Sequence, residues 1–362
     1  MTPFAKSPFA DQREPSPGTS SRKTFSSAAF CVLLSAVLRL SVRWLILGLV
    51  TAAATPGAES PPAATLPAGV KRVVFLGDSI THGGAYVNDV EAYFLTRAPE
   101  RAIEWINVGL SSETVSGLSE PGHANGQFPR PDLHERLARV LALTRPDLVF
   151  ACYGMNDGIY LPLDEGRFAP FRRGLQWLNE QVASAGARII HLTPPIYDEA
   201  RGGKPGYAAT LDRYAQWLLE QPSEANWRVI DVHAAMQRAV DARRKVDTKF
   251  GFARDGVHPD DAGHWVIARA ILLGLGARDI TDTTTLEAML AAHPHGREIL
   301  ALVAQRQAVM KLAWLSATKH LRPGVKPGLP LDEARAKAAE IGQQIAALQP
   351  QLNSNSLPLD KR

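Results

Sequence analysis

The stretch VVFLGDSITHGG, residues 73–84, contains four consecutive apolar residues that run directly into Gly-Asp-Ser. An uninterrupted apolar run of this kind is typical of a strand buried on both faces in a parallel sheet. Ser79 then lies just beyond the carboxyl end of that strand, where open α/β sheets bind their ligands. Three roles fit a serine at this point: a turn or helix-capping residue, part of a phosphate-binding loop, or a nucleophile. The stretch alone leaves these roles open.

Four more apolar runs follow the same pattern, and each is bounded by Gly, Pro or Asp. Amphipathic stretches separate them; in one, Leu133, Leu137 and Val140 share a helix face. Strands that alternate with helices predict a three-layer α/β/α sandwich with a five-stranded parallel, flavodoxin-like sheet. The five expected strands are residues 72–78, 103–110, 147–154, 188–195 and 227–234.

The alternation stops near residue 280, which sets the expected domain at 70–280. Residues 281–350 contain helical patterns and no strand pattern. Apolar residues at alternating spacings of three and four predict an αα-hairpin extension packed on the domain: Leu331, Ala334, Ala338, Ile341, Ile345 and Leu348. The last residues, 351–362, are polar, and we expect a disordered tail.

Residues 1–54 are typical of an export signal. They contain two apolar runs of eleven residues, separated by Arg39 and Arg43, and each run is too short to span a bilayer. The second run ends in three alanines, a cleavage pattern. We therefore expect a signal peptide and a secreted or periplasmic protein. The alternative is an uncleaved N-terminal segment that anchors the protein to the inner membrane. Residues 55–69 resemble a flexible linker.

The charge balance argues against a nucleic-acid-binding protein, and the cysteine content argues against a disulfide-stabilised one. Of the 40 basic and 36 acidic residues, six and two lie within 1–54, which leaves 34 of each sign. A neutral remainder argues against nucleic-acid binding. Cys31 lies in the leader, so Cys152 has no partner for an internal disulfide. Because Cys152 stands in an apolar run, we expect a buried residue with no catalytic role.

Polar residues also follow the second and third predicted strands. Asn107 and Gly109 end the second strand, Asn156 follows the third, and Asp255 and His258 stand three apart far downstream. Acyl transfer needs a hydroxyl, a base that takes its proton, a group that orients the base, and donors for the oxyanion. These residue types can supply each part.

The sequence resembles the SGNH/GDSL hydrolase superfamily in four motifs that occur in the family's order. They are GDSI (77–80), NVGLSSETV (107–115), GMND (154–157) and DGVH (255–258), within a resemblance that covers about residues 70–275. The resemblance implies an ester hydrolase with Ser79 as nucleophile, His258 as base and Asp255 as its orienter. It also implies an oxyanion hole formed by the N–H groups of Ser79 and Gly109 and the Asn156 side chain.

Other polar residues are candidates for a substrate rim. His82, His123, Asp157, Lys319 and Arg322 are the candidates, although each also fits a turn or a solvated surface. Lys319 and Arg322 would reach the site if the Pro/Gly-rich turn after them folds back over the strand ends.

Some motifs are better read as structural. Trp265 and Trp314 are expected in the core, and His264 as a capping or surface residue. The segment HERLA (134–138) lacks the second histidine of a zinc-binding helix, so no metal is expected. Neither GxxxxGK[ST] nor GxGxxG occurs, so no cofactor is expected either.

Together these features predict a serine esterase that hydrolyses acyl esters, O-acetyl esters on carbohydrate being the first choice. Its partner would be a small-molecule or glycan ester substrate. A lipolytic acylhydrolase or lysophospholipase is the alternative enzyme. A third hypothesis is a non-catalytic module that binds glycan or phosphate. We do not expect the protein to bind nucleic acid. We expect contact with a membrane only through the N-terminal segment, if that segment is not cleaved.

Overall fold

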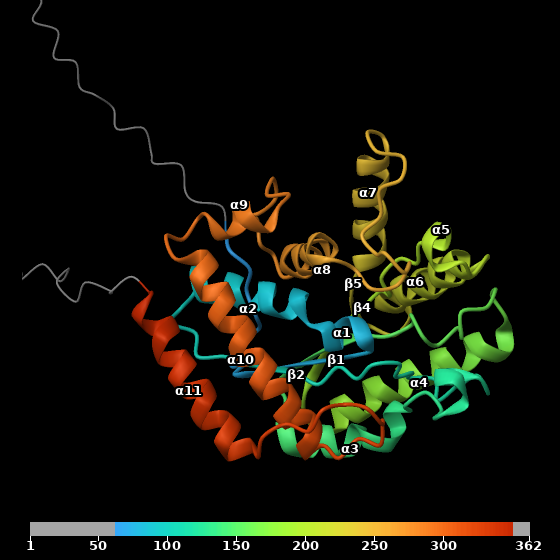
Figure 1. Ribbon diagram of the computed structural model, residues 1–362, viewed down its shortest axis with the longest axis horizontal. Helices are drawn as coiled ribbons and strands as arrows, with labels where there is room; N and C mark the ends of the chain where they lie inside the picture. The colour runs from blue at the N-terminus through green and yellow to red at the C-terminus, as the bar shows by residue number, and fades with distance from the viewer. Residues whose placement is uncertain (1–61, 350–362) are drawn as a thin grey trace, which may run out of the picture. The chain divides into compact units, whose positions relative to one another are not determined.

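A computed structural model of the chain describes residues 62–349, and a five-stranded parallel sheet forms its centre (Figure 1). The strand order is β2-β1-β3-β4-β5. This order confirms the predicted flavodoxin-like sheet. The strands are β1 (Arg72–Gly77), β2 (Glu104–Asn107), β3 (Leu148–Cys152), β4 (Arg188–Leu192) and β5 (Arg228–Ile230).

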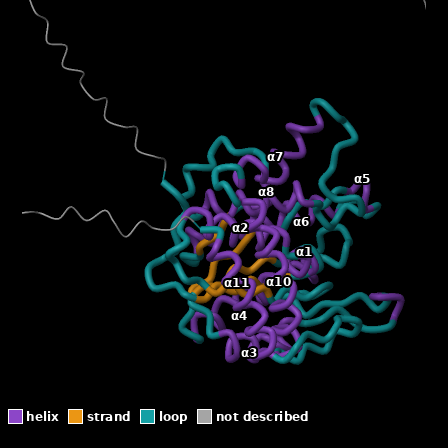
Figure 2. Tube along the Cα trace, turned by 60° about the vertical axis from the view of Figure 1, so that its left-hand side comes forward, coloured by secondary structure: helices purple, strands orange, loops and turns teal. Residues whose placement is uncertain are grey.

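Helices cover both faces of the sheet, as the tube in Figure 2 shows. Helices α2, α7 and α8 contribute to one hydrophobic core, and α3, α4 and α6 contribute to a second core on the opposite face. The helices are α1 (Ser79–Gly83), α2 (Ala85–Arg97), α3 (Leu133–Thr144), α4 (Glu165–Ser184), α5 (Glu199–Gly202), α6 (Tyr207–Glu224), α7 (Val232–Arg244), α8 (Asp261–Gly274), α9 (Leu286–Leu290), α10 (Gly296–Ala317) and α11 (Leu331–Ala347), with a 3₁₀ turn at His123–Gly126.

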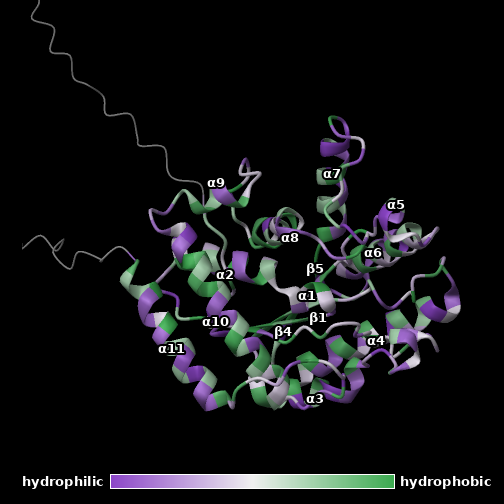
Figure 3. Ribbon diagram, in the orientation of Figure 1, coloured by the Kyte–Doolittle hydropathy of each residue, from purple (hydrophilic) through white to green (hydrophobic). Residues whose placement is uncertain are grey.

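Strand β1 explains the apolar run that opens the domain. Its side chains alternate between the two faces, so Val73 and Phe75 enter one core while Val74 and Leu76 enter the other. All four are fully buried. In Figure 3 the hydrophobic colour follows the strands and the inward faces of the helices. Because both faces of this strand are buried among apolar side chains, functional polar residues can lie only at its end.

The C-terminal helices form the expected hairpin. Helices α10 and α11 lie side by side, and α10 also packs against α2 and β2 (Figure 1). Trp314 of α10 and Ala334 of α11 are buried in the same core as Val74. Residues 62–349 belong to one compact unit, so the hairpin is part of the same domain as the sheet. Helix α9 is capped by Thr285, whose side chain accepts the Ala288 N–H at 3.2 Å.

Part of the predicted linker is ordered, which corrects the expectation for residues 55–69. Ala64 and Leu66 are only 5% exposed. The Thr65 N–H donates to the Leu275 carbonyl at 3.1 Å. The apolar residues among the prolines therefore pack on the domain from residue 62 onward.

Several sequence predictions fall outside the described residues. These are the leader at 1–54 with Cys31, the beginning of the linker, and the tail at 351–362. Within residues 62–349, no helix has the length and apolar character needed to cross a membrane. Cys152 is buried and free, as expected, and burial raises its pKa well above the usual thiol value.

Candidate active site

Ser79 is the first residue of α1, directly after the β1 strand. The turn is fixed by Asp78, whose side chain caps α1 by accepting the Ile80 N–H at 2.9 Å. Asp78 is buried, and burial raises its pKa to about 7. Since Ser79 occupies the first helical position, its own N–H has no acceptor within the helix. The hydroxyl and the N–H of one residue are thus both available at the strand end.

Ser79, His258 and Asp255 form a continuous hydrogen-bonded chain. His258 Nε2 lies 2.8 Å from Ser79 Oγ, and His258 Nδ1 lies 2.6 Å from Asp255 Oδ2. Burial acts to raise the pKa of Asp255, but hydrogen bonds from the His258 ring and from two backbone N–H groups outweigh it and lower the pKa to about 2. Asp255 is therefore ionised at neutral pH and can orient the imidazole. This is the nucleophile–base–orienter geometry of acyl transfer.

The loop that carries His258 is fixed by a glycine. Gly256 has a φ of +79°, and an added Cβ would lie 2.5 Å from Gly202 N and 2.6 Å from Asp198 O. Its carbonyl accepts the Asp198 N–H at 3.0 Å. Only a residue without a side chain allows the loop to dock this closely on α5.

Gly109 packs against α1, but its N–H is already engaged. An added Cβ would lie 2.5 Å from His82 N, so the glycine is needed for close approach. Its N–H donates to Asn107 Oδ1 at 2.9 Å, while Asn107 Nδ2 donates to Thr81 O at 2.7 Å. The oxyanion role expected for this N–H therefore requires that a substrate oxygen share it with Asn107 or displace that side chain.

Asn156 is buried after β3 with its amide held on both sides. Its Oδ1 accepts hydrogen bonds from Arg130 Nη1 at 2.9 Å and from the Tyr160 hydroxyl at 3.1 Å. Its Nδ2 donates to Glu113 O at 3.2 Å. An asparagine amide has two hydrogens to donate, so one remains for a reacting oxygen.

Asp157 does not lie on a substrate rim, which corrects that prediction. It is fully buried. Its carboxylate accepts the N–H groups of Val115, Ser116 and Gly154 at 2.8–3.0 Å. Burial raises its pKa to about 6. The side chain instead joins the loops that follow β2 and β3.

Two of the remaining rim candidates, His82 and Arg322, contact the loop that follows β2. His82 Nδ1 lies 3.0 Å from Gly109 O, and burial, together with the Lys311 ammonium group, lowers its pKa. Arg322 Nε donates to Ser111 O at 2.8 Å, and its guanidinium stands 5.3 Å from the centre of the Phe128 ring. The turn between α10 and α11 therefore does fold back to the loop after β2.

His123 and Lys319 contact other residues instead of the Ser79–His258–Asp255 group. His123 Nδ1 lies 3.4 Å from Glu120 Oε1, and Lys319 is exposed, with its carbonyl accepting a hydrogen bond from Arg139. Neither side chain forms a hydrogen bond or ion pair with Ser79, His258 or Asp255.

His264 is buried, so the expectation of a surface or capping role is wrong. Asp260 caps α8, and Asp261 is its first residue. Helix α8 packs on α2, and this buries His264, whose Nδ1 accepts the Tyr86 N–H at 3.4 Å. Burial lowers its pKa to about 4. Trp265 and Trp314 are each 2% exposed, as predicted for core residues.

Sequence reasoning missed four residues that support the site. Arg130 and Tyr160 contact Asn156, Glu113 accepts from it, and Lys311 Nζ donates to the His82 carbonyl at 2.5 Å. None stands in a strand-end motif except Glu113, within NVGLSSETV. The residues next to Arg130 in its polar loop do not indicate that it contacts Asn156. The residues next to Lys311 in its amphipathic helix likewise do not indicate that it contacts His82.

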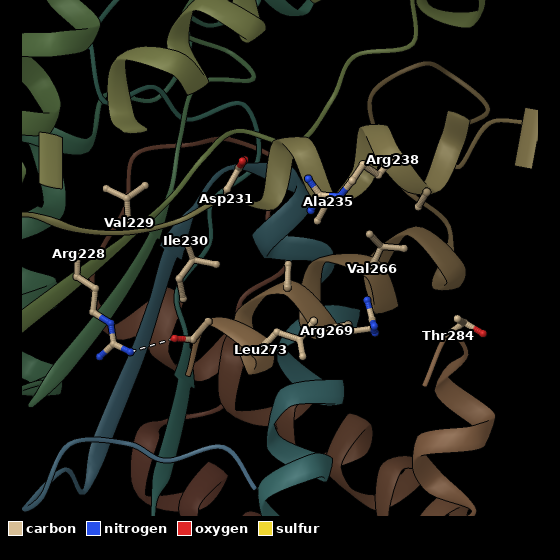
Figure 4. Close-up of a pocket in the computed structure, with 13 residues that line it drawn as sticks. Arg228, Val229, Ile230, Asp231, Ala235, Arg238, Val266, Arg269, Leu273 and Thr284 are labelled. Atoms are coloured by element: carbon tan, nitrogen blue, oxygen red, sulfur yellow. Dashed lines mark hydrogen bonds between the residues drawn. The ribbon is translucent and has the colours of Figure 1, made fainter. Parts of the chain in front are cut away.

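The cavity in Figure 4 lies away from this site. It has a volume of about 530 Å³ and is lined by residues of β5, α7 and α8 together with Thr284. Arg228 donates to Gly274 O across it at 3.2 Å. None of the site residues described above lines it. Within residues 62–349, no three His, Cys, Asp or Glu side chains converge as metal ligands.

Comparison with known proteins gives matches across the same region. A model of the GDSL-like lipase/acylhydrolase family matches residues 75–266. An acetylxylan esterase of Geobacillus stearothermophilus is 26% identical over 231 residues, which are 57% of this chain and 94% of that protein.

Solved structures with similarity include the acetylxylan esterase Axe2 of Geobacillus stearothermophilus. It is 25% identical with a TM-score of 0.44, over 57% of this chain and 94% of that chain. The diltiazem-metabolizing gut microbial enzyme BT4096 is 23% identical with a TM-score of 0.47, over 60% of this chain and 48% of that chain.

Proposed function

The chain belongs to the GDSL-like lipase/acylhydrolase family and is a carboxylic ester hydrolase, and we propose that it removes O-acetyl groups from carbohydrate through an acyl-enzyme on Ser79. One observation carries the proposal of a serine mechanism. The Ser79 hydroxyl lies 2.8 Å from His258 Nε2, and His258 lies 2.6 Å from an ionised Asp255. A serine hydroxyl is a weak nucleophile unless such a base accepts its proton.

The first half of the reaction acylates Ser79. Oγ forms a bond to the carbonyl carbon while His258 Nε2 takes the Oγ proton, and the carbonyl oxygen becomes an oxyanion. The bond to the leaving alcohol oxygen then breaks, and His258 returns its proton to that oxygen. Asp255 stays ionised and stabilises the imidazolium.

The second half restores the enzyme. His258 takes a proton from water as the water oxygen attacks the acyl carbon, and the proton then passes to Ser79 Oγ as acetate leaves. The Ser79 N–H and the remaining Asn156 amide hydrogen are the proposed oxyanion donors. Losing one such donor slows kcat by about 10²–10³ in comparable enzymes.

The proposed substrate is an acetylated glycan. The support is the acetylxylan esterase relative and an open site, since the side chains of His258 and Asp255 are 51% and 55% exposed. An open site suits an ester on a polymer. His82, His123, Lys319 and Arg322 are proposed as polar contacts for the sugar.

We also propose that residues 1–54 direct export of the protein. N-terminal sequencing of the secreted or periplasmic protein would test this proposal.

Acetate release from a panel of acetylated polysaccharides tests the function. Wild-type protein should release acetate, and Ser79→Ala should not while keeping the same Tm. Equal release by both proteins would contradict the assignment of Ser79.

A series of p-nitrophenyl esters separates the alternatives. Activity that peaks at acetate supports the acetylesterase, whereas a peak at acyl chains of eight or more carbons supports the lipolytic acylhydrolase. No labelling of Ser79 by a fluorophosphonate probe, together with no hydrolysis, would favour the binding module.

A further inference from the structure

The geometry points to Arg130 and Tyr160 as positioning residues that hold the Asn156 amide in the one orientation that offers its NH₂ group to the oxyanion. The inference rests on the proposed function. Neither residue belongs to a motif that carries the family resemblance. Both act at the same atom, Asn156 Oδ1.

The hydrogen bonds at both ends of the amide fix which way it points. Arg130 Nη1 and the Tyr160 hydroxyl both donate to Oδ1, at 2.9 and 3.1 Å. If the amide turned over, its NH₂ group would face the Arg130 N–H and its Oδ1 would face the Glu113 carbonyl, so these two hydrogen bonds would be lost. The Tyr160 hydroxyl, which donates to Oδ1, would then have to turn and accept. The third contact, from Nδ2 to Glu113 O, uses only one of the two amide hydrogens. The second hydrogen is therefore left in a defined direction.

Arg130 is itself held in place by Glu120. Its Nε and Nη2 donate to the two carboxylate oxygens of Glu120 at 2.6 and 2.7 Å. This two-point contact leaves Nη1 for Asn156, and the side chain is buried with 8% exposure. A planar guanidinium can satisfy both partners at once, whereas a lysine ammonium cannot reproduce the fork.

Tyr160 reaches Asn156 through an unusual backbone. Ile159 and Tyr160 have φ values of +56° and +55°, a conformation that costs about 1–2 kcal/mol for each residue with a side chain. The Ile159 N–H donates back to Asn156 O at 3.1 Å. The Tyr160 ring packs 4.9 Å from the Tyr207 ring and 5.4 Å from the Arg130 guanidinium carbon. The turn brings the hydroxyl back onto the asparagine four residues earlier.

The electrostatic consequence is greatest in the transition state. A charged donor on Oδ1 polarises the amide, which strengthens the N–H group as a donor. That donor matters most when the carbonyl oxygen becomes negative. Loss of either positioning residue should therefore lower kcat and leave KM almost unchanged.

A double-mutant cycle on p-nitrophenyl acetate tests the inference. Tyr160→Phe removes one oxygen atom and keeps the ring; we expect kcat to fall about 3- to 10-fold with KM within about twofold, in keeping with the loss of one hydrogen bond. Asn156→Ala should lower kcat about 10²–10³-fold. If Tyr160 acts through Asn156, Tyr160→Phe should slow the Asn156→Ala enzyme no further. Arg130→Lys should follow the same pattern.

Tyr214→Phe is the matched control. Its hydroxyl is buried and has no hydrogen-bond partner among residues 62–349, and its ring stacks on Phe171 at 4.2 Å. We expect its kcat to match that of the wild type. If Arg130→Lys does not fold, Tyr160→Phe still decides the question, because it changes no packing.

The outcomes separate this inference from the proposed function. An active wild type, an inactive Ser79→Ala and multiplicative effects of Tyr160→Phe and Asn156→Ala would overturn the inference alone. A rise in KM with kcat unchanged would also overturn it. A Ser79→Ala protein as active as the wild type would overturn the proposed function and this inference together.

Discussion

The hydroxyl oxygen of Ser79 lies 2.8 Å from Nε2 of His258, although the two residues are 179 positions apart in the chain. Ser79 is held by the end of β1 and the cap of α1. His258 is held by a loop that docks on α5 through Gly256. The contact therefore depends on the placement of that loop as much as on the two side chains.

Gly256→Ala should damage catalysis by displacing this loop. The new methyl group would lie 2.5 Å from Gly202 N at a φ of +79°. Because misplacement of a catalytic group by about 1 Å costs about 10²-fold in rate, we expect a fall in kcat of at least that order. Gly203→Ala is the control: its φ is +65°, but nothing lies within 4 Å of the added Cβ. Equal losses in both variants would show that backbone strain alone is responsible.

Asp255→Asn should lower kcat about 10⁴-fold at neutral pH while leaving the fold intact. An asparagine cannot select the tautomer of His258 that accepts the Ser79 proton, nor stabilise the imidazolium. Steady-state kinetics with p-nitrophenyl acetate measure this. Asp261→Asn changes an exposed carboxylate on α8 and should have no comparable effect. Near-normal turnover by Asp255→Asn would contradict the role of Asp255.

Asp89 should make the protein less stable as the pH rises. It is 3% exposed on α2, and burial, with Asp261 and Glu287 nearby, raises its pKa to about 8. Between about pH 4 and 8 the unfolded chain loses this proton while the folded protein retains it, so stability falls through that window and then levels off. Asp89→Asn has no proton to lose. Its stability advantage over wild type should therefore grow from pH 4 to 9, by about 5 kcal/mol if the whole shift is expressed.

Urea unfolding at pH 4, 6 and 9 measures this difference. Asp282→Asn, which changes an exposed carboxylate, is the control. A difference between wild type and Asp89→Asn that stays constant with pH would contradict the prediction.

Arg136→Met should destabilise the protein strongly. Arg136 Nε donates to Glu113 Oε1 at 2.6 Å, and both side chains are fully buried. Removing one member of such a pair leaves an uncompensated buried charge, which costs about 3–5 kcal/mol. Removing both charges, in Arg136→Met with Glu113→Leu, should recover much of the loss. Urea unfolding of the wild type, the single variant and the double variant measures their free energies of unfolding. A double variant less stable than Arg136→Met would contradict the prediction.

The five parallel strands and the strand-end motifs could be predicted because both leave local patterns in the sequence. A strand buried on two faces must be apolar at every position, as Val73 to Leu76 are, and polar groups can stand only at its end. The support around Asn156 could not be predicted. Arg130 lies in a loop whose sequence does not indicate a partner 26 residues away, and the left-handed backbone at Ile159 is atypical of a β-branched residue.

The same reason explains the wrong predictions. Asp157 and His264 are polar residues next to turns, and from sequence alone a surface position is the natural expectation. In the folded protein, three backbone N–H groups surround Asp157, and the packing of α8 on α2 buries His264.

The sequence by itself determined the α/β/α sandwich, the family and the residue types needed for acyl transfer, because hydrophobic periodicity and short motifs are local properties. Only the tertiary structure decided which of these residues meet. It joined Ser79 to His258, left the Gly109 N–H on Asn107, and placed Arg130 and Tyr160 on Asn156. Hydrogen bonds act over about 3 Å, so their partners are set by the packing of distant segments and not by their spacing in the chain.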